Sequence, residues 1–84
     1  NITMRVKEYF YLKDHFDLDA YVINITYKKE IVTLDFLRAK IAQFKIDYHA
    51  LVVRTGLDGQ ETYNAAGNHL NAIYDNYFLN DFGE

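Results

Sequence analysis

The first third of the chain follows the period of a β-strand. In residues 2–12 an apolar residue stands at almost every even position, whereas polar residues and tyrosines stand at the odd ones. Residues 20–27 alternate in the same way, and residues 13–19 between them are polar enough for a loop. Alternation with a period of two is typical of a strand with one buried face. We therefore expect two antiparallel strands joined by a loop.

The spacing then changes to that of a helix. Between residues 34 and 48, apolar residues recur at steps of three and four, which places them on one stripe of a helical wheel. The members of the stripe are Leu34, Leu37, Ile41, Phe44 and Tyr48. Thr33 can cap the first turn with its hydroxyl, and Asp35 in that turn suits the helix dipole. We expect a helix that starts after Thr33 and ends between Lys45 and Tyr48.

A second hairpin and a second helix are expected in the last third. Residues 49–55 are apolar and β-branched, and residues 60–65 form a weaker run. Asp58-Gly59 between them tolerates the positive φ angles of a type I′ hairpin turn. The stretch lacks the Lys-Ser/Thr pair of a phosphate-binding loop and the ligand ladder of a calcium loop. Apolar residues at helical spacing then predict a helix over residues 66–79.

These elements follow the order ββαββα in one domain, residues 1–84. The simplest packing is an α+β two-layer sandwich, in which a mainly antiparallel four-stranded sheet carries both helices on one face. A free edge of such a sheet can pair with a second copy of the chain, so a homodimer is a further alternative.

The composition excludes several kinds of chemistry. The 84 residues include no Cys and no Ser, so disulfides, thiolates and the commonest hydroxyl nucleophile are absent. A chain without Cys suits a reducing compartment, and no apolar run approaches the roughly 20 residues that span a bilayer. We therefore expect a cytoplasmic, non-catalytic protein that has no cofactor and no membrane segment.

Charge divides the chain and suggests a partner. All nine Lys and Arg residues lie within residues 1–54, whereas residues 55–84 contain five acids and no base. An acidic, aromatic surface is suited to a basic protein, because aromatic rings supply contact area and the acids steer the approach. We expect an accessory or inhibitor protein that binds through its C-terminal hairpin and helix. The expected contact residues are Asp58, Glu61, Tyr63, Tyr74, Asp75, Phe78, Asp81 and Phe82.

The basic part of the chain supports an alternative. Its cations are interleaved with tyrosines, and a basic, aromatic sheet face could stack single-stranded nucleic acid. The strand, turn, strand and helix order also loosely resembles small modules that insert strands into a DNA groove. The residues of this alternative are Arg5, Lys7, Tyr9, Tyr11, Tyr27, Lys28, Lys29, Arg38, Lys40 and Lys45.

A metal site is the remaining alternative. Asp14, His15, Asp17 and Asp19 stand within six residues, and such a group could hold a divalent cation. A calcium loop would also need a glycine at its sharp turn and a closing Glu, both of which are missing. The pattern favours a solvated connection over a metal site.

Overall fold

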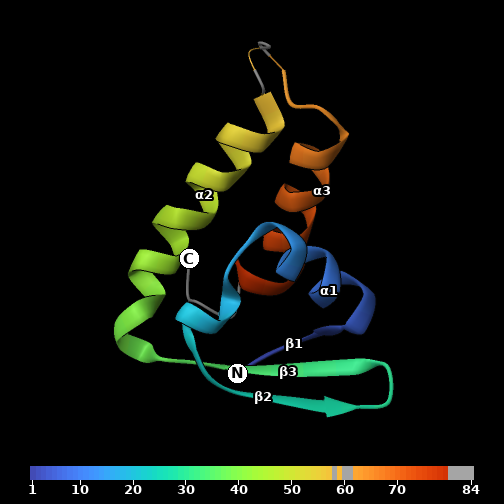
Figure 1. The fold of residues 1–84 in the computed structure, drawn as a ribbon, viewed down its shortest axis with the longest axis vertical. Helices are drawn as coiled ribbons and strands as arrows, with labels where there is room; N and C mark the ends of the chain where they lie inside the picture. The colour runs from blue at the N-terminus through green and yellow to red at the C-terminus, as the bar shows by residue number, and fades with distance from the viewer. Residues whose placement is uncertain (58, 60–61, 80–84) are drawn as a thin grey trace.

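The computed structural model describes residues 1–57, 59 and 62–79. Within them, three strands form one sheet and three α-helices pack above it (Figure 1). The strands are β1 (Ile2–Arg5), β2 (Val22–Lys28) and β3 (Ile31–Phe36). The helices are α1 (Val6–His15), α2 (Ile41–Leu57) and α3 (Ala65–Ile73). Short 3₁₀ turns, η1 (Leu18–Ala20) and η2 (Arg38–Lys40), precede β2 and α2, and a π-helical turn, η3 (Tyr74–Phe78), continues α3.

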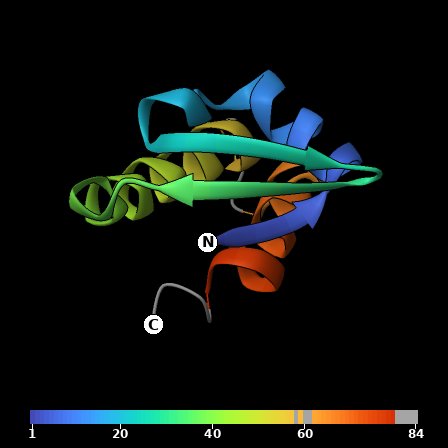
Figure 2. The same cartoon turned by 90° about the horizontal axis from the view of Figure 1, so that it is seen from below.

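The sheet is antiparallel, with strand order β1-β3-β2. Its central strand, β3, pairs with both neighbours, so Thr33 stands opposite Thr3 on one side and Thr26 on the other. Seen from below, the strands lie in front and the helices behind them (Figure 2). The fold therefore has two layers, and none of the described helices covers the second face of the sheet.

The core lies between the sheet and the helices. Ile2, Met4, Val32 and Leu34 point toward the helices and are almost completely buried. Phe44 of α2 lies at their centre, where its ring makes edge contacts with Phe36 and Phe78 at centroid distances of 4.8 and 4.9 Å. Edge-to-face contacts of this kind add to the free energy gained from burial alone.

The predicted four-stranded sheet with two helices is wrong, although the α+β class is correct. The first error lies in residues 6–12, which form most of α1 instead of continuing a strand. Tyr9 and Leu12 are buried three residues apart, whereas Phe10 is 52% exposed. Val6 and Leu12 fit a helix as well as an alternating strand, whereas Tyr9 fits only the helical face, and burial of that face decides between the two.

The second error concerns the predicted central helix and the strand after it. Ile31–Phe36 forms β3, in which Val32 and Leu34 face the core, and α2 begins only at Ile41. This helix continues to Leu57 and includes the predicted strand 49–55. Leu51 and Val52 extend its buried stripe, so tertiary burial outweighs the weak strand preference of β-branched residues.

The predicted second hairpin is likewise absent from the described residues. Asp58 and residues 60–61 lie outside them, and residues 62–64 are not a strand. Gly59 does have a positive φ of 81°, but the segment connects two helices instead of two strands. The predicted final helix over residues 66–79 is confirmed by α3 and η3.

Candidate functional site

The face of the sheet opposite the described helices is the candidate binding surface. Alternate residues of each strand point toward the core, so the intervening ones point outward. The strand register arranges these outward residues in three rows across the sheet. The first row is Arg5, Ile31 and Lys28, the second is Thr3, Thr33 and Thr26, and the third is Asp35 and Asn24. We call these eight residues the open face.

Most side chains of the open face are short and polar. The hydroxyl oxygens of Thr3 and Thr33 lie 3.4 Å apart, and the Asn24 amide donates to the Thr26 hydroxyl at 3.4 Å. Contacts of this length are weak, so these groups keep most of their capacity to bind a ligand. Asp35 Oδ1 is buried and accepts no hydrogen bond from the described residues. The open face therefore offers a flat set of donors and acceptors.

Cations surround the hairpin end of this face. Arg5, Lys7, Lys28 and Lys29 lie on β1, the first turn of α1 and the β2–β3 hairpin. A hollow of about 350 Å³ lies beside two of these cations, and it is lined by Arg5, Val6, Lys7, Glu30 and Ile31. In the described part of the chain, none of the four cationic side chains forms an ion pair. Their charges are therefore available to an anion.

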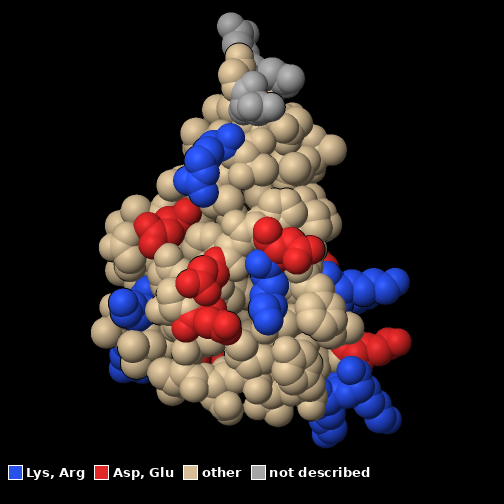
Figure 3. Space-filling view, in the orientation of Figure 1, with Lys and Arg blue, Asp and Glu red and all other residues tan. Residues whose placement is uncertain are grey.

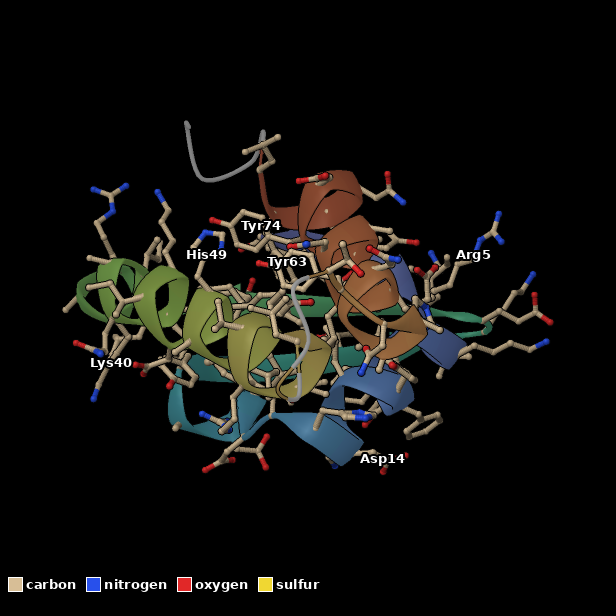
Figure 4. All side chains as sticks on the ribbon, turned by 90° about the horizontal axis from the view of Figure 1, so that it is seen from above. Arg5, Asp14, Lys40, His49, Tyr63 and Tyr74 are labelled. Atoms are coloured by element: carbon tan, nitrogen blue, oxygen red, sulfur yellow. The ribbon has the colours of Figure 1, made fainter. Side chains whose placement is uncertain are left out.

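A second group of cations lies beyond the other end of the sheet. Arg38 and Lys40 occupy η2, which directly follows β3, and both are exposed. Arg5 and Lys40 lie at opposite ends of the sheet (Figure 4). Figure 3 likewise shows Lys and Arg on both sides of the lower part of the molecule, where the sheet lies.

The acidic side chains are mostly elsewhere. In Figure 3 most of the visible Asp and Glu gather in the middle of the molecule, above the sheet. Two carboxylates accept hydrogen bonds from tyrosines within the molecule: Tyr21 donates to Asp47, and Tyr77 donates to Glu8. Burial and the bond to Asp47 raise the pKa of Tyr21 to about 12, and the same bond lowers the pKa of Asp47. These carboxylates are occupied in holding the fold.

The structure buries two of the predicted protein-binding residues and exposes two others. Tyr74 and Phe78 are core residues, exposed by 2% and 0%, because η3 directs their rings toward α2. Asp75 and Tyr63 are exposed. Asp58, Glu61, Asp81 and Phe82 lie outside the described residues. The two aromatic anchors thus offer no surface to a partner in this conformation, and protein binding stays a prediction.

The basic, aromatic sheet face that the sequence suggested has its cations but not its rings. Tyr9 and Tyr11 belong to α1, and Tyr27 points to the helix side, where its hydroxyl lies 3.5 Å from that of Tyr9. The described open face therefore carries no aromatic side chain. The sequence did not reveal the threonine row, because Thr33 fits a helix cap and residues 34–36 fit a first helical turn. The signal for a polar outer face that the sequence did contain was the set of polar positions in the alternating pattern, Asn24, Thr26 and Lys28.

The acidic segment around Asp17 does not converge on a metal site. Within the described residues, no three His, Asp or Glu side chains are placed to share an ion. His15 instead uses Nδ1 to contact the Tyr11 carbonyl oxygen at 2.9 Å. Among the described helices, none is both long and apolar enough to cross a bilayer.

Compared with known proteins, the chain matches no family model, no curated protein and no solved structure. A function must therefore be inferred from the chemistry of the surface itself.

Proposed function

We propose that this protein is a non-catalytic DNA-binding module that places the open face of its sheet in the major groove of a duplex. The observation that carries this proposal is a helix-free sheet face with short polar side chains and cations at both ends. The major groove of B-DNA is about 12 Å wide and admits β-strands. Sheets that read DNA in this way are known among several protein classes.

The side-chain types on the open face suit both contacts to phosphate and contacts to the bases. Arg5 and Lys28 on the face, with Lys7 and Lys29 beside it, would neutralise phosphates or reach guanine. Asn24 can pair with adenine, and threonines can contact either base edges or the thymine methyl group. Asp35 carries a negative charge that disfavours phosphate, but an aspartate can accept from the cytosine amino group. The face thus combines positioning contacts with groups that distinguish bases.

The absence of aromatic rings from the described open face favours a duplex over a single strand. Single-strand binders depend on base stacking against aromatic side chains. Double-stranded RNA is also a poorer fit, because its major groove is too narrow and deep for side chains to read. We therefore expect duplex DNA to bind more tightly than single strands or duplex RNA.

The formal net charge of −3 does not oppose this proposal. The potential near the sheet depends on local charges, because distant ones are screened within about 10 Å at moderate salt. Six of the nine Lys and Arg residues belong to the two groups described at the ends of the sheet. The cysteine-free composition suits a reducing compartment, and we place this activity in the cytoplasm.

Binding of a basic protein is the second candidate. It is favoured by the acidic side chains that gather above the sheet in Figure 3. In that case this chain would act as an accessory factor or inhibitor, and its contact with the basic protein would leave the open face free. Mutations on the open face therefore distinguish the two candidates.

The test compares two double variants in a DNA-binding titration. Arg5→Ala/Lys28→Ala removes two cations of the open face, and Lys13→Ala/Arg54→Ala removes two cations from α1 and α2. Each phosphate contact contributes roughly −0.9 to the slope of log affinity against log salt for a duplex. We expect the open-face variant to lose affinity and to reduce this slope by about 2, while the control keeps both values. Failure of the intact protein to bind duplex DNA at low salt, or equal losses in the two variants, would show that the proposal is wrong.

A further inference from the structure

Strand β2 has one unpaired edge. In the described sheet it pairs only with β3, so one row of its backbone groups faces outward. Two large apolar residues of β2 remain largely exposed, Ile23 with 68% and Tyr27 with 55% of their surface. Ile23 has no partner on β3, because the register shifts by one residue between Val22 and Asn24. An exposed edge that carries large apolar side chains is a site for strand addition.

We propose that β2 pairs antiparallel with β2 of a second copy of the chain, about a two-fold axis at Ile25. This register places Ile23 of each copy directly opposite Tyr27 of the other. It also places Asn24 opposite Thr26, so polar side chains meet polar ones. A closed two-fold contact requires a surface that is complementary to itself, and β2 has this property.

The charges around β2 support the same arrangement. Asp17 and Asp19 lie just before the start of β2, whereas Lys28 and Lys29 lie at its end, and all four are exposed. Antiparallel pairing brings the acidic start of one strand beside the basic end of the other. The two ends attract in this orientation, whereas a parallel pair would bring like charges together.

Pairing would join two three-stranded sheets into one sheet of six strands. The helices of both copies stay on the same side, so the two open faces become continuous. The proposal rests on the β2 edge alone and does not depend on DNA binding.

The first test exchanges the facing apolar pair for a charged pair. Ile23→Glu alone and Tyr27→Lys alone each place two like charges near the interface and leave apolar groups opposite them. In the double variant, each new carboxylate faces a new ammonium group of the other copy. By analytical ultracentrifugation we expect the intact chain to be a dimer, each single variant a monomer and the double variant a dimer again. A monomeric intact chain, dimeric single variants or a monomeric double variant would each overturn the proposal.

The second test uses the absence of cysteine from the chain. Residues directly opposite each other in an antiparallel pair have Cα atoms about 4.5–5.5 Å apart, within the range that a disulfide bridges. Ile25→Cys would therefore cross-link two copies at the axis on oxidation. Ile23→Cys is the matched control, because the two copies of residue 23 would lie roughly 13 Å apart. Residue 23 is the more exposed position, so cross-linking there as fast as at residue 25 would indicate random collision and contradict the register.

Discussion

Two glycines determine how closely α2 and α3 approach each other. A Cβ atom built on Gly67 would lie 2.5 Å from the Gly56 Cα, and one built on Gly56 would lie 2.7 Å from the Gly67 Cα. Both contacts are with backbone, which cannot move aside as a flexible side chain can. Glycine inside a helix costs about 1 kcal/mol relative to alanine. Close packing of α2 against α3 explains why both positions carry glycine.

We expect Gly67→Ala to lower the free energy of unfolding by about 1–3 kcal/mol, because the added methyl group forces the helices apart. Helix propensity alone predicts the opposite sign, a gain of about 1 kcal/mol. Asn68→Ala is the control, since it introduces alanine at an exposed position of the same helix and should be neutral or slightly stabilising. Urea unfolding measures both variants, and a stabilised Gly67→Ala protein would contradict the close contact.

At the scale of elements, the β2–β3 hairpin turns through an unfavourable backbone conformation. Lys29 has a φ of 57°, in the left-handed region. A residue with a Cβ atom loses about 1–2 kcal/mol there, and lysine has no short polar side chain to compensate. Strain of this kind is often found where a side chain serves a function. Lys29 directly follows β2, so the proposed DNA binding would give a reason for the strain at this position.

Lys29→Gly should therefore change stability and binding in opposite directions. We expect the free energy of unfolding to rise by up to about 1 kcal/mol, because glycine adopts positive φ without strain. Affinity for duplex DNA should fall, since one cation is lost. Lys28→Gly removes a neighbouring cation from regular strand and should lower both quantities. Thermal unfolding and the DNA titration together check these signs, and a less stable Lys29→Gly protein would disprove the strain.

At the scale of the whole molecule, we expect tyrosines with raised pKa values to set the alkaline limit of stability. Burial is the main cause of the raised pKa of Tyr9, Tyr21 and Tyr48, and the bond to Glu8 is the main cause for Tyr77. In the unfolded chain a tyrosine titrates near pH 10. The folded pKa values are higher. The stability that the protonated tyrosines contribute is therefore fully present below pH 10 and is lost as the pH rises above 10.

We expect the free energy of unfolding to fall steeply above pH 10. Tyr21 has a folded pKa of about 12, so Tyr21→Phe should make this decline shallower between pH 10 and 12. Between pH 7 and 9 the hydroxyl is protonated in both states, and the curves of the two proteins should run parallel. Denaturant unfolding across this pH range measures both effects, and identical slopes above pH 10 would contradict the role of Tyr21.

The sequence predicted those elements whose pattern fits only one period. Residues 20–27 alternate clearly and correspond to β2, and the stripe over residues 66–79 corresponds to α3 and η3. Val6, Tyr9 and Leu12 suit a helical face, while Val6 and Leu12 also fit an alternating strand, so residues 6–12 were assigned to the wrong element. Leu34, Leu37 and Ile41 fit a helix, yet Val32 and Leu34 are buried by strand pairing.

The candidate site could be predicted only in part for the same reason. The cations of the open face, Arg5 and Lys28, were identified from the sequence, but the tyrosines grouped with them lie on α1 or on the core side of β2. The threonine row requires the pairing of β3 with both neighbours, and its pairing with β1 connects residues 30 positions apart. No local pattern contains that information.

By itself, the sequence determined which chemistry the chain lacks and which segments carry each charge. A chain without Cys or Ser cannot form a disulfide or use a serine nucleophile in any fold. The tertiary structure alone decided that Tyr74 and Phe78 belong to the core and that Thr3, Thr26 and Thr33 form one outward row. The physical reason is that short apolar runs satisfy the period of a helix and of a strand nearly equally. The burial of distant residues against one another then selects the structure that forms.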